Sequence, residues 1–186
     1  MGAIGVAMLA GAVEALLTAG GPGPRTRHTA FFDIGGGYGG TWGLPGTIDV
    51  KDSGAFRFKA GYRTRPLGDG GGMALELALS TGFRGLGTGD NDKGGFGLST
   101  VGGELRLYGR AREALQPYLQ GGCLYYSLDD GRERDGVGVQ GGGGVQIWAH
   151  RNLAVDINLV YDAVFFKRVE ATPQGLTSTL GLKLYF

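Results

Sequence analysis

Apolar and polar residues alternate along the chain from Phe31 onward, with the period of two that indicates strands with two different faces. The segment Leu153–Ala163 shows this most clearly, because five apolar residues alternate there with Asp156, Asn158 and Asp162. Similar patterns predict strands in seven further segments, which are Ala30–Trp42, Ala55–Tyr62, Met73–Phe83, Leu98–Tyr108, Leu115–Leu128, Val137–Ala149 and Leu180–Phe186. In Leu115–Leu128 the two faces stay unassigned, because both carry apolar residues.

The connections between the eight predicted strands alternate in character. Longer polar or glycine-rich connections follow the odd-numbered strands, at Gly43–Ser53, Arg84–Gly95, Asp129–Gly136 and Phe165–Gly175. Generally tighter connections follow the even-numbered ones, at Thr64–Gly72, Gly109–Ala114 and His150–Asn152. This alternation predicts an up-and-down antiparallel barrel whose two ends lie in different environments, as short periplasmic turns and longer external loops do in membrane barrels.

Alternation alone fits two inverted barrels, because a soluble carrier turns its apolar face inward and a membrane barrel turns it toward lipid. Strands of about 9 to 13 residues are long enough to cross a bilayer at a tilt. The polar face carries equal numbers of cations and carboxylates, which can pair across a narrow lumen. We therefore predict a charge network in the lumen, formed by Asp33, Arg57, Lys59, Arg63, Glu76, Glu104, Arg106, Asp156, Asp162 and Lys183.

The chain ends on a predicted strand with apolar residues at every second position, namely Leu180, Leu182, Leu184 and Phe186. Together with the strand count, this ending resembles the OmpA/OmpX-like small outer-membrane β-barrels, whose last strand characteristically ends in an aromatic residue read by the assembly machinery. The resemblance covers roughly residues 31–186. It implies an all-β, eight-stranded antiparallel up-and-down transmembrane β-barrel, a monomer, with outer-membrane lipid and the barrel assembly machinery as partners. It also implies that Leu180, Leu182, Leu184 and Phe186 form the membrane-assembly signal.

Composition sharpens this picture. Of 186 residues, 40 are glycine, and each glycine in a helix interior costs roughly 1 kcal/mol relative to alanine, so a helical protein is disfavoured. In a small barrel, the glycine clusters at 35–40 and 141–144 would allow sharp curvature and make room for large inward side chains. A net charge of +1 without a basic run excludes a generic nucleic-acid binder. Cys123 is the single cysteine, so no internal disulfide can form.

The N-terminal segment is apolar over residues 2–20 apart from Glu14 and Thr18, and a Gly-Pro-rich stretch follows before Arg25. We interpret residues 1–24 as an atypical signal peptide without a basic start, and residues 25–186 as the outer-membrane barrel domain. A poorly ordered N-terminal helix is the alternative.

Aromatic residues near the predicted strand ends fit the girdles that membrane barrels place at the two lipid–water interfaces. They are Trp42, Tyr62, Phe83, Trp148, Tyr161 and Phe165. Scattered packing in a core is the alternative for each of them.

Short motifs for other functions are incomplete. Residues 35–40 match G-x-G-x-x-G, but no helix follows to face a pyrophosphate. Residues 90–95 open like a calcium loop, yet Gly94 and Val101 occupy positions that require oxygen ligands. His28 and His150 lie in no recognisable hydrolase or metal-binding spacing. We therefore predict no catalytic residue, no cofactor and no metal site.

These features predict an outer-membrane protein with a structural or surface-interaction role rather than an enzyme. An open pore is not expected, because side chains fill the interior of an eight-stranded barrel. The loops Arg84–Gly95 and Asp129–Gly136 would present surface to an extracellular partner of unknown identity. Two alternatives stay open. One is a soluble lipocalin-like carrier of a small apolar ligand, favoured by Gly40-Thr41-Trp42, and the other is a lipid-modifying outer-membrane enzyme.

Overall fold

The computed structural model describes residues 29–42, 50–51, 53–66, 72–88, 96–109, 114–129, 133–166 and 172–186. Within these ranges the chain forms nine strands. They are β1 (Thr29–Trp42), β2 (Val50–Lys51), β3 (Ser53–Arg63), β4 (Met73–Thr88), β5 (Phe96–Gly109), β6 (Leu115–Asp129), β7 (Glu133–Trp148), β8 (Leu153–Phe166) and β9 (Gln174–Tyr185). No helix within the described ranges is long and apolar enough to cross a membrane.

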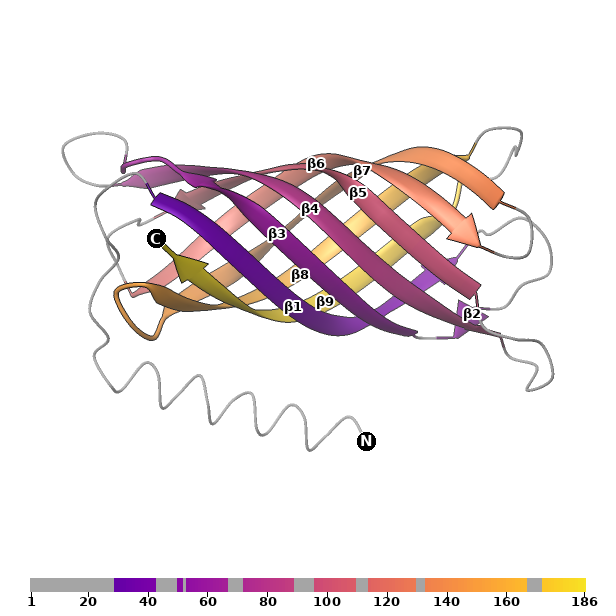
Figure 1. Ribbon diagram of the computed structural model, residues 1–186, viewed down its shortest axis with the longest axis horizontal. Coiled ribbons are helices and arrows are strands. Elements are labelled where there is room, and N and C mark those ends of the chain that lie inside the picture. Colours follow the sequence, from indigo (N-terminus) through magenta and orange to yellow (C-terminus); the bar gives the residue numbers. More distant parts are fainter. Residues whose placement is uncertain are drawn as a thin grey trace, which may run out of the picture.

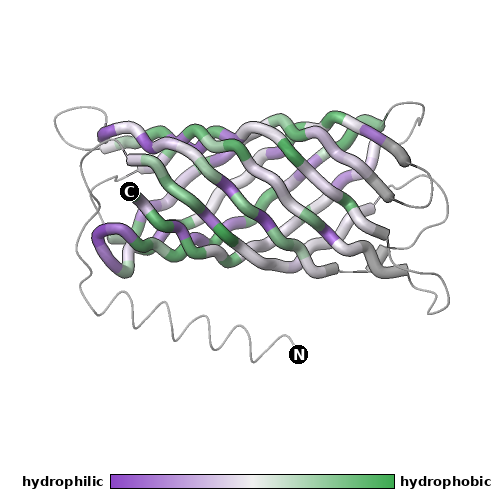
Figure 2. Tube along the Cα trace, viewed as in Figure 1, coloured by the Kyte–Doolittle hydropathy of each residue, from purple (hydrophilic) through white to green (hydrophobic). Residues whose placement is uncertain are grey.

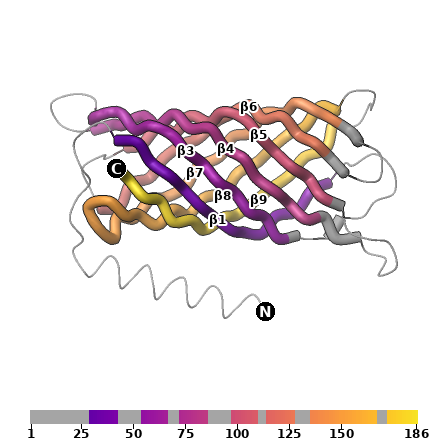
Figure 3. The backbone as a smooth tube through the Cα atoms, in the orientation of Figure 1, coloured from indigo at the N-terminus to yellow at the C-terminus, as the bar shows by residue number. Residues whose placement is uncertain are grey.

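Eight of the strands close into a single antiparallel barrel (Figure 1). Each long strand pairs with its neighbours in the chain, and β1 pairs with β9 from Phe31↔Tyr185 to Trp42↔Gln174, which closes the sheet. The short β2 is an addition to the end of β4, where Val50 pairs with Thr88. The predicted all-β, eight-stranded up-and-down barrel is therefore confirmed, and its strands run obliquely around the axis (Figure 3).

The long strands contain 11 to 16 residues and extend beyond the predicted range. The predicted loop Arg84–Gly95 is wrong in its first part, because β4 continues to Thr88 and pairs with β5 up to Leu86↔Phe96. The predicted loop Asp129–Gly136 is similarly replaced by the β6–β7 hairpin, which pairs out to Asp129↔Glu133. The alternation of polar and apolar residues does not predict these extensions, because hydrogen-bonded strands can continue past the apolar part of the wall.

The predicted contrast between long and short connections is correspondingly weaker. Between β6 and β7 only residues 130–132 lie outside the strands, whereas residues 64–72 separate β3 from β4 at the opposite end. We call the end that contains Phe186 and the turn 149–152 the turn end, and the opposite end the loop end.

The inner face of the wall carries the buried charged and polar residues and the outer face carries exposed apolar ones, and hydrophilic and hydrophobic residues alternate along much of the chain (Figure 2). Lys59, Arg106 and Lys183 point inward and are 2% exposed or less. Leu79 and Leu119 point outward and are 75% and 70% exposed. A soluble carrier requires the opposite arrangement, with an apolar lumen. The lipocalin-like alternative therefore does not fit this barrel.

The faces of β6 are now assigned. Tyr118, Leu124 and Tyr126 are buried inside the barrel, whereas Leu119 and Tyr125 are exposed on its outer wall. The buried tyrosines explain why the alternation is weak in this strand, since large aromatic residues occur on both faces.

Glycines on the inner face make room for large inward side chains of neighbouring strands. Tyr118 lies directly opposite Gly144 in the β6–β7 pairing, and a Cβ atom on Gly144 would lie only 2.6 Å from the Tyr118 hydroxyl oxygen. Phe31 lies opposite Gly61, Leu124 opposite Gly102 and Phe166 opposite Gly136 in the same way. Tyr126 crowds Gly138 from the diagonal position, since it is paired with Gly136. We call Gly61, Gly102, Gly136, Gly138 and Gly144 the lumen glycines.

Candidate functional site

A cluster of charged and aromatic side chains fills the lumen at the turn end, centred on Glu76. The Lys183 ammonium donates to Glu76 Oε2 at 2.8 Å, and the hydroxyls of Tyr108 and Tyr185 donate to the same carboxylate at 2.9 and 2.6 Å. Arg63 Nη1 lies 3.4 Å from Glu76 Oε1. We call Arg63, Glu76, Tyr108, Lys183 and Tyr185 the basal cluster. Its members come from β3, β4, β5 and β9, so it ties distant parts of the wall together.

Aromatic rings complete the closure at this end. The Trp148 ring stacks on Tyr185 with centroids 4.6 Å apart, and the Arg63 guanidinium lies 4.4 Å from the centre of the Tyr108 ring. The predicted girdle position of Trp148 is therefore wrong, because its side chain is 2% exposed and lies inside the barrel. The reason is strand parity. Trp148 shares the inward face of β7 with Gln146, so being near a strand end does not place it at the lipid interface.

Two further ion-paired groups lie in the middle of the lumen. Lys59 on β3 pairs with Glu104 on β5. Arg106 lies 3.1 Å from Asp156 Oδ2 and 3.8 Å from Asp33 Oδ2, so one guanidinium serves two carboxylates. Burial removes water from these charges, and a pair that loses one partner would leave a charge uncompensated.

Toward the loop end, Arg84 spans the lumen. Its Nη2 lies 3.1 Å from Asp162 Oδ1 and also bonds Thr177 Oγ1, while its Nη1 donates to Thr41 Oγ1 at 2.8 Å. Arg84 is not among the residues predicted to face the lumen, because the sequence pattern places it in a loop. The signal that could have revealed it is register, since Ser80, Gly82 and Arg84 continue the inward positions of β4.

All ten residues of the predicted charge network occupy inward positions, and nine of them are buried. The exception is Arg57, which is only partly buried and donates from Nη2 to Thr179 Oγ1 at 3.1 Å. The structure joins the others in the pairs described above. It adds uncharged polar partners that the sequence did not indicate, notably Gln116, which accepts from Arg63 Nη2 at 2.6 Å.

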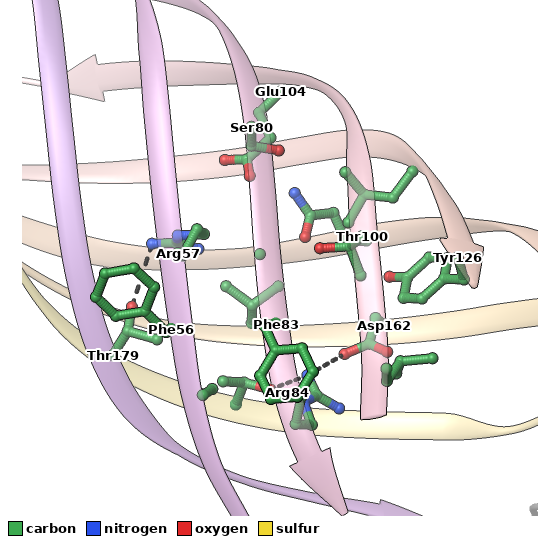
Figure 4. Close-up of a pocket in the computed structure, with 17 residues that line it drawn as sticks. Phe56, Arg57, Ser80, Phe83, Arg84, Thr100, Glu104, Tyr126, Asp162 and Thr179 are labelled. Carbon is green, nitrogen blue, oxygen red and sulfur yellow. Dashed lines mark hydrogen bonds and ion pairs between the residues drawn. The ribbon is translucent and has the colours of Figure 1, made fainter. Parts of the chain in front are cut away.

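A cavity of about 60 Å³ lies in the loop-end half of the lumen (Figure 4). It lies between the Lys59–Glu104 pair and the Arg84–Asp162 pair, and Arg57, Glu104, Arg84 and Asp162 all contribute to its lining. A space of this size holds a few water molecules, because each needs roughly 10 to 15 Å³. It is far smaller than the several hundred Å³ of a typical site for an organic ligand.

The outer wall is apolar over the middle of the barrel. Leu77, Leu105, Val139, Leu159 and Leu182 are each 44 to 57% exposed there. In water, a continuous apolar belt of this kind would be a site of association. Around a closed barrel, it matches the lipid-facing band of a membrane-spanning wall.

Comparison with known proteins identifies the architecture. No protein-family model matches this chain, and no curated protein matches it. Among solved structures, Neisserial surface protein A superposes with a TM-score of 0.65 at 17% identity, covering 84% of this chain and 97% of its own. Ail of Yersinia pestis gives a TM-score of 0.54 at 16% identity over 86% and 99% of the two chains. OprG of Pseudomonas aeruginosa gives 0.53 at 12% identity over 86% and 97%.

The chain has the fold of the small outer-membrane β-barrels. This confirms, at the level of fold, the resemblance indicated by its last strand. In outer-membrane barrels, lipid-facing and lumen-facing residues alternate along the strands, and the exposed apolar and buried polar residues of this chain follow the same pattern. Identities below 20% carry no residue role from those proteins to this one.

The last strand of this outer-membrane barrel fold presents an apolar row to the outside. Leu180, Leu182, Leu184 and Phe186 are 43, 53, 42 and 64% exposed. The backbone N–H of Phe186 donates to the Ala30 carbonyl at 2.9 Å, so the row extends to the seam between β9 and β1. These four residues therefore have the alternating outward placement that a terminal assembly signal requires. Their recognition by the assembly machinery stays a prediction.

Other aromatic residues of the predicted girdles do face outward. Trp42 and Tyr161 contact each other near the loop end, with ring centroids 6.3 Å apart, and Trp42 Nε1 donates to Gln174 Oε1 at 3.1 Å. Phe83 and Phe165 are also exposed on the wall, as is Tyr62 close to the turn end. Amphipathic rings in these positions suit an interface between lipid tails and water.

The discarded motifs fall into three groups. Residues 35–40 lie within β1, which gives no helix N-terminus for a phosphate. His150 is exposed in the turn between β7 and β8. His28 and residues 90–95 lie outside the described residues, as does the predicted signal peptide at 1–24. In the part of the chain that is described, no group of three or more potential metal-ligating side chains occurs.

Proposed function

We propose that this protein is a monomeric barrel of the bacterial outer membrane with a structural or surface-interaction role. The observation that carries the proposal is the inverted distribution of polarity, with charged residues in the lumen and leucines on the wall. Lipid would cover the apolar wall, and closure of the sheet would leave no strand edge in the membrane. The barrel assembly machinery would insert the chain, using Leu180 to Phe186.

The filled lumen argues against an open pore. The basal cluster and Trp148 occupy the turn end, and the cavity of about 60 Å³ described above lies in the loop-end half. Eight strands enclose only enough space for side chains. We therefore expect the protein to conduct ions poorly.

Contacts with an extracellular partner would take place at the loop end. The mixed-sign sequence Asp129-Asp130-Gly131-Arg132-Glu133-Arg134-Asp135 provides charges of both signs there. The side chains of residues 130–134 lie outside the described set, so this surface stays a hypothesis drawn from sequence. A partner with charges of both signs would suit it.

Cell fractionation combined with heat-dependent gel mobility tests the membrane assignment. A closed outer-membrane barrel should pellet with the outer membrane and migrate differently before and after boiling in detergent. Recovery in the soluble periplasm without a mobility shift would overturn the proposal. Analysis of lipid A from cells that overproduce the protein tests the enzymatic alternative, and an altered lipid A would favour an enzyme over the structural role.

A further inference from the structure

Arg57 differs from the other cations in the lumen. Lys59, Arg63, Arg84, Arg106 and Lys183 each have a carboxylate oxygen within 4 Å. Arg57 has none among the described residues, and its guanidinium donates to a neutral hydroxyl, Thr179 Oγ1, at 3.1 Å.

The charges of the described lumen do not cancel. Six cations face inward, but only five carboxylates face inward among the described residues. The carboxylates are Asp33, Glu76, Glu104, Asp156 and Asp162. One positive charge is therefore left, and the pairing places it at Arg57. An uncompensated charge becomes more costly as burial removes water from it, and Arg57 is partly buried. The apolar outer wall supplies no counter-charge.

The cavity of about 60 Å³ adjoins Arg57 and is lined by neutral hydrogen-bond donors (Figure 4). Ser80, Thr100 and Thr179 line it. The Thr179 hydroxyl, which accepts from Arg57, donates its own proton to Asn158 Oδ1 at 2.8 Å. Gln140 also lines the cavity, and its Nε2 is buried and has no hydrogen-bond partner among the described residues. A cation beside several neutral donors is the environment that binds an anion.

Two carboxylate oxygens restrict what the cavity accepts. Glu104 Oε1 and Asp162 Oδ2 are buried without hydrogen-bond partners in the described structure, while the other oxygen of each group is paired with Lys59 or Arg84. They would repel any anion, a divalent one more strongly than a monovalent one, so a bound ion would have to lie beside Arg57 and away from these two oxygens, which can accept hydrogen bonds from water. The cavity has space for one small ion and a few waters. Larger organic anions therefore do not fit.

We propose that the loop-end half of the lumen binds one small monovalent anion, of the size of chloride or bromide, at Arg57. Ser80, Thr100 and Gln140 would donate its remaining hydrogen bonds, and the ion would offset the excess charge of the described part of the lumen. This site lies inside the barrel and goes beyond the proposed surface role.

A crystal structure of the full chain in detergent with sodium bromide tests the site directly. Anomalous scattering should place one bromide within about 3.5 Å of the Arg57 guanidinium nitrogens, the range of a charge-assisted hydrogen bond to a large anion. Cavity density from water only would overturn the proposal. Bromide bound only at exterior cations such as Arg151 would overturn it too.

Thermal unfolding gives a second readout. In bromide at ten times its dissociation constant, the wild-type Tm should exceed that in sodium gluconate of equal ionic strength by about 3 °C. Arg57→Gln should abolish this difference, whereas Arg151→Gln, which removes an exposed arginine of the turn, should keep it. A wild-type chain without the difference, or an Arg57→Gln variant that retains it, would contradict the proposal. Should Arg57→Gln fail to fold, the bromide map of the wild type decides alone.

Discussion

The Glu76 carboxylate accepts a hydrogen bond from the Lys183 ammonium at 2.8 Å, across a lumen in which both side chains are buried. The two residues are 107 positions apart in the chain and come from β4 and β9. Because Arg63, Tyr108 and Tyr185 contact the same carboxylate, Glu76 is the common acceptor of the basal cluster.

Replacing Glu76 should therefore be strongly destabilising. Glu76→Gln leaves the charges of Lys183 and Arg63 without their carboxylate, and breaking a buried pair in this way costs about 3 to 5 kcal/mol. Urea unfolding of the refolded barrel in micelles, followed by gel mobility, measures the change. Asp135→Asn is the matched control, because Asp135 is exposed at the loop end and its substitution should stay within about 0.5 kcal/mol. Equal stabilities of the two variants would contradict the central role of Glu76.

The lumen glycines predict a difference between neighbouring positions of one glycine cluster. Gly144→Ala should cost about 1 to 3 kcal/mol by overpacking, because its Cβ would clash with the backbone carbonyl oxygen of Ile157 and would meet the Tyr118 side chain at 2.6 Å. Gly141→Ala has nothing within 4 Å of its Cβ and should be neutral or stabilising. Urea unfolding midpoints of the two variants provide the comparison. A Gly141→Ala variant as unstable as Gly144→Ala would show that backbone freedom, rather than space, selects these glycines.

A charge on the outer wall should have a cost that depends on depth. Leu159 lies in the middle of β8 and is 52% exposed, so Leu159→Arg should destabilise the folded barrel in lipid vesicles by about 2 to 4 kcal/mol. Val137 is 55% exposed but lies nearer the loop end, opposite Phe165, and Val137→Arg should cost about 0 to 1 kcal/mol. Similar small effects at both positions would indicate that water, not lipid, surrounds the wall.

Removing Phe186 should impair insertion more than stability. Its side chain is 64% exposed, so its deletion removes little packing from the folded barrel. We expect the fraction of heat-modifiable protein in the outer membrane to fall, while protein refolded in micelles keeps a nearly unchanged unfolding midpoint. Phe165→Ala is the control, since this exposed aromatic lies at the opposite end of the wall. Normal insertion of the deletion variant would remove the assembly role assigned to the last strand.

How far the sequence could predict this structure depends on how different the two faces of each strand are. In β8 one face carries Asp156 and Asp162 and the other Leu159, so the alternation predicts both the strand and its orientation. In β6, Tyr118 faces inward and Leu119 outward. Hydropathy cannot separate these faces, because a tyrosine can lie in a polar lumen with its hydroxyl directed at a partner.

The sequence could predict which residues face inward, but it could not predict which residues they contact. Parity places Arg63 and Glu76 on the same inner face, whereas the contact of Glu76 with Lys183 depends on how the closed sheet is staggered. Arg84 was missed because its glycine-rich surroundings are typical of a loop. Its side chain nevertheless follows the inward register of Ser80 and contacts Asp162 across the lumen.

The pairing of Tyr118 with Gly144 also restricts how β6 and β7 can align. Strands rich in glycine are prone to slippage, because their faces carry little information. A slip of two residues that brought Tyr118 opposite Gln146 would also bring Leu124 opposite Gln140, so both side chains would lose the glycine that faces each of them in the observed register. A slip in the other direction would bring Gln120 opposite Gln140. The steric fit of Tyr118 and Leu124 against glycines thus favours the observed alignment of this hairpin.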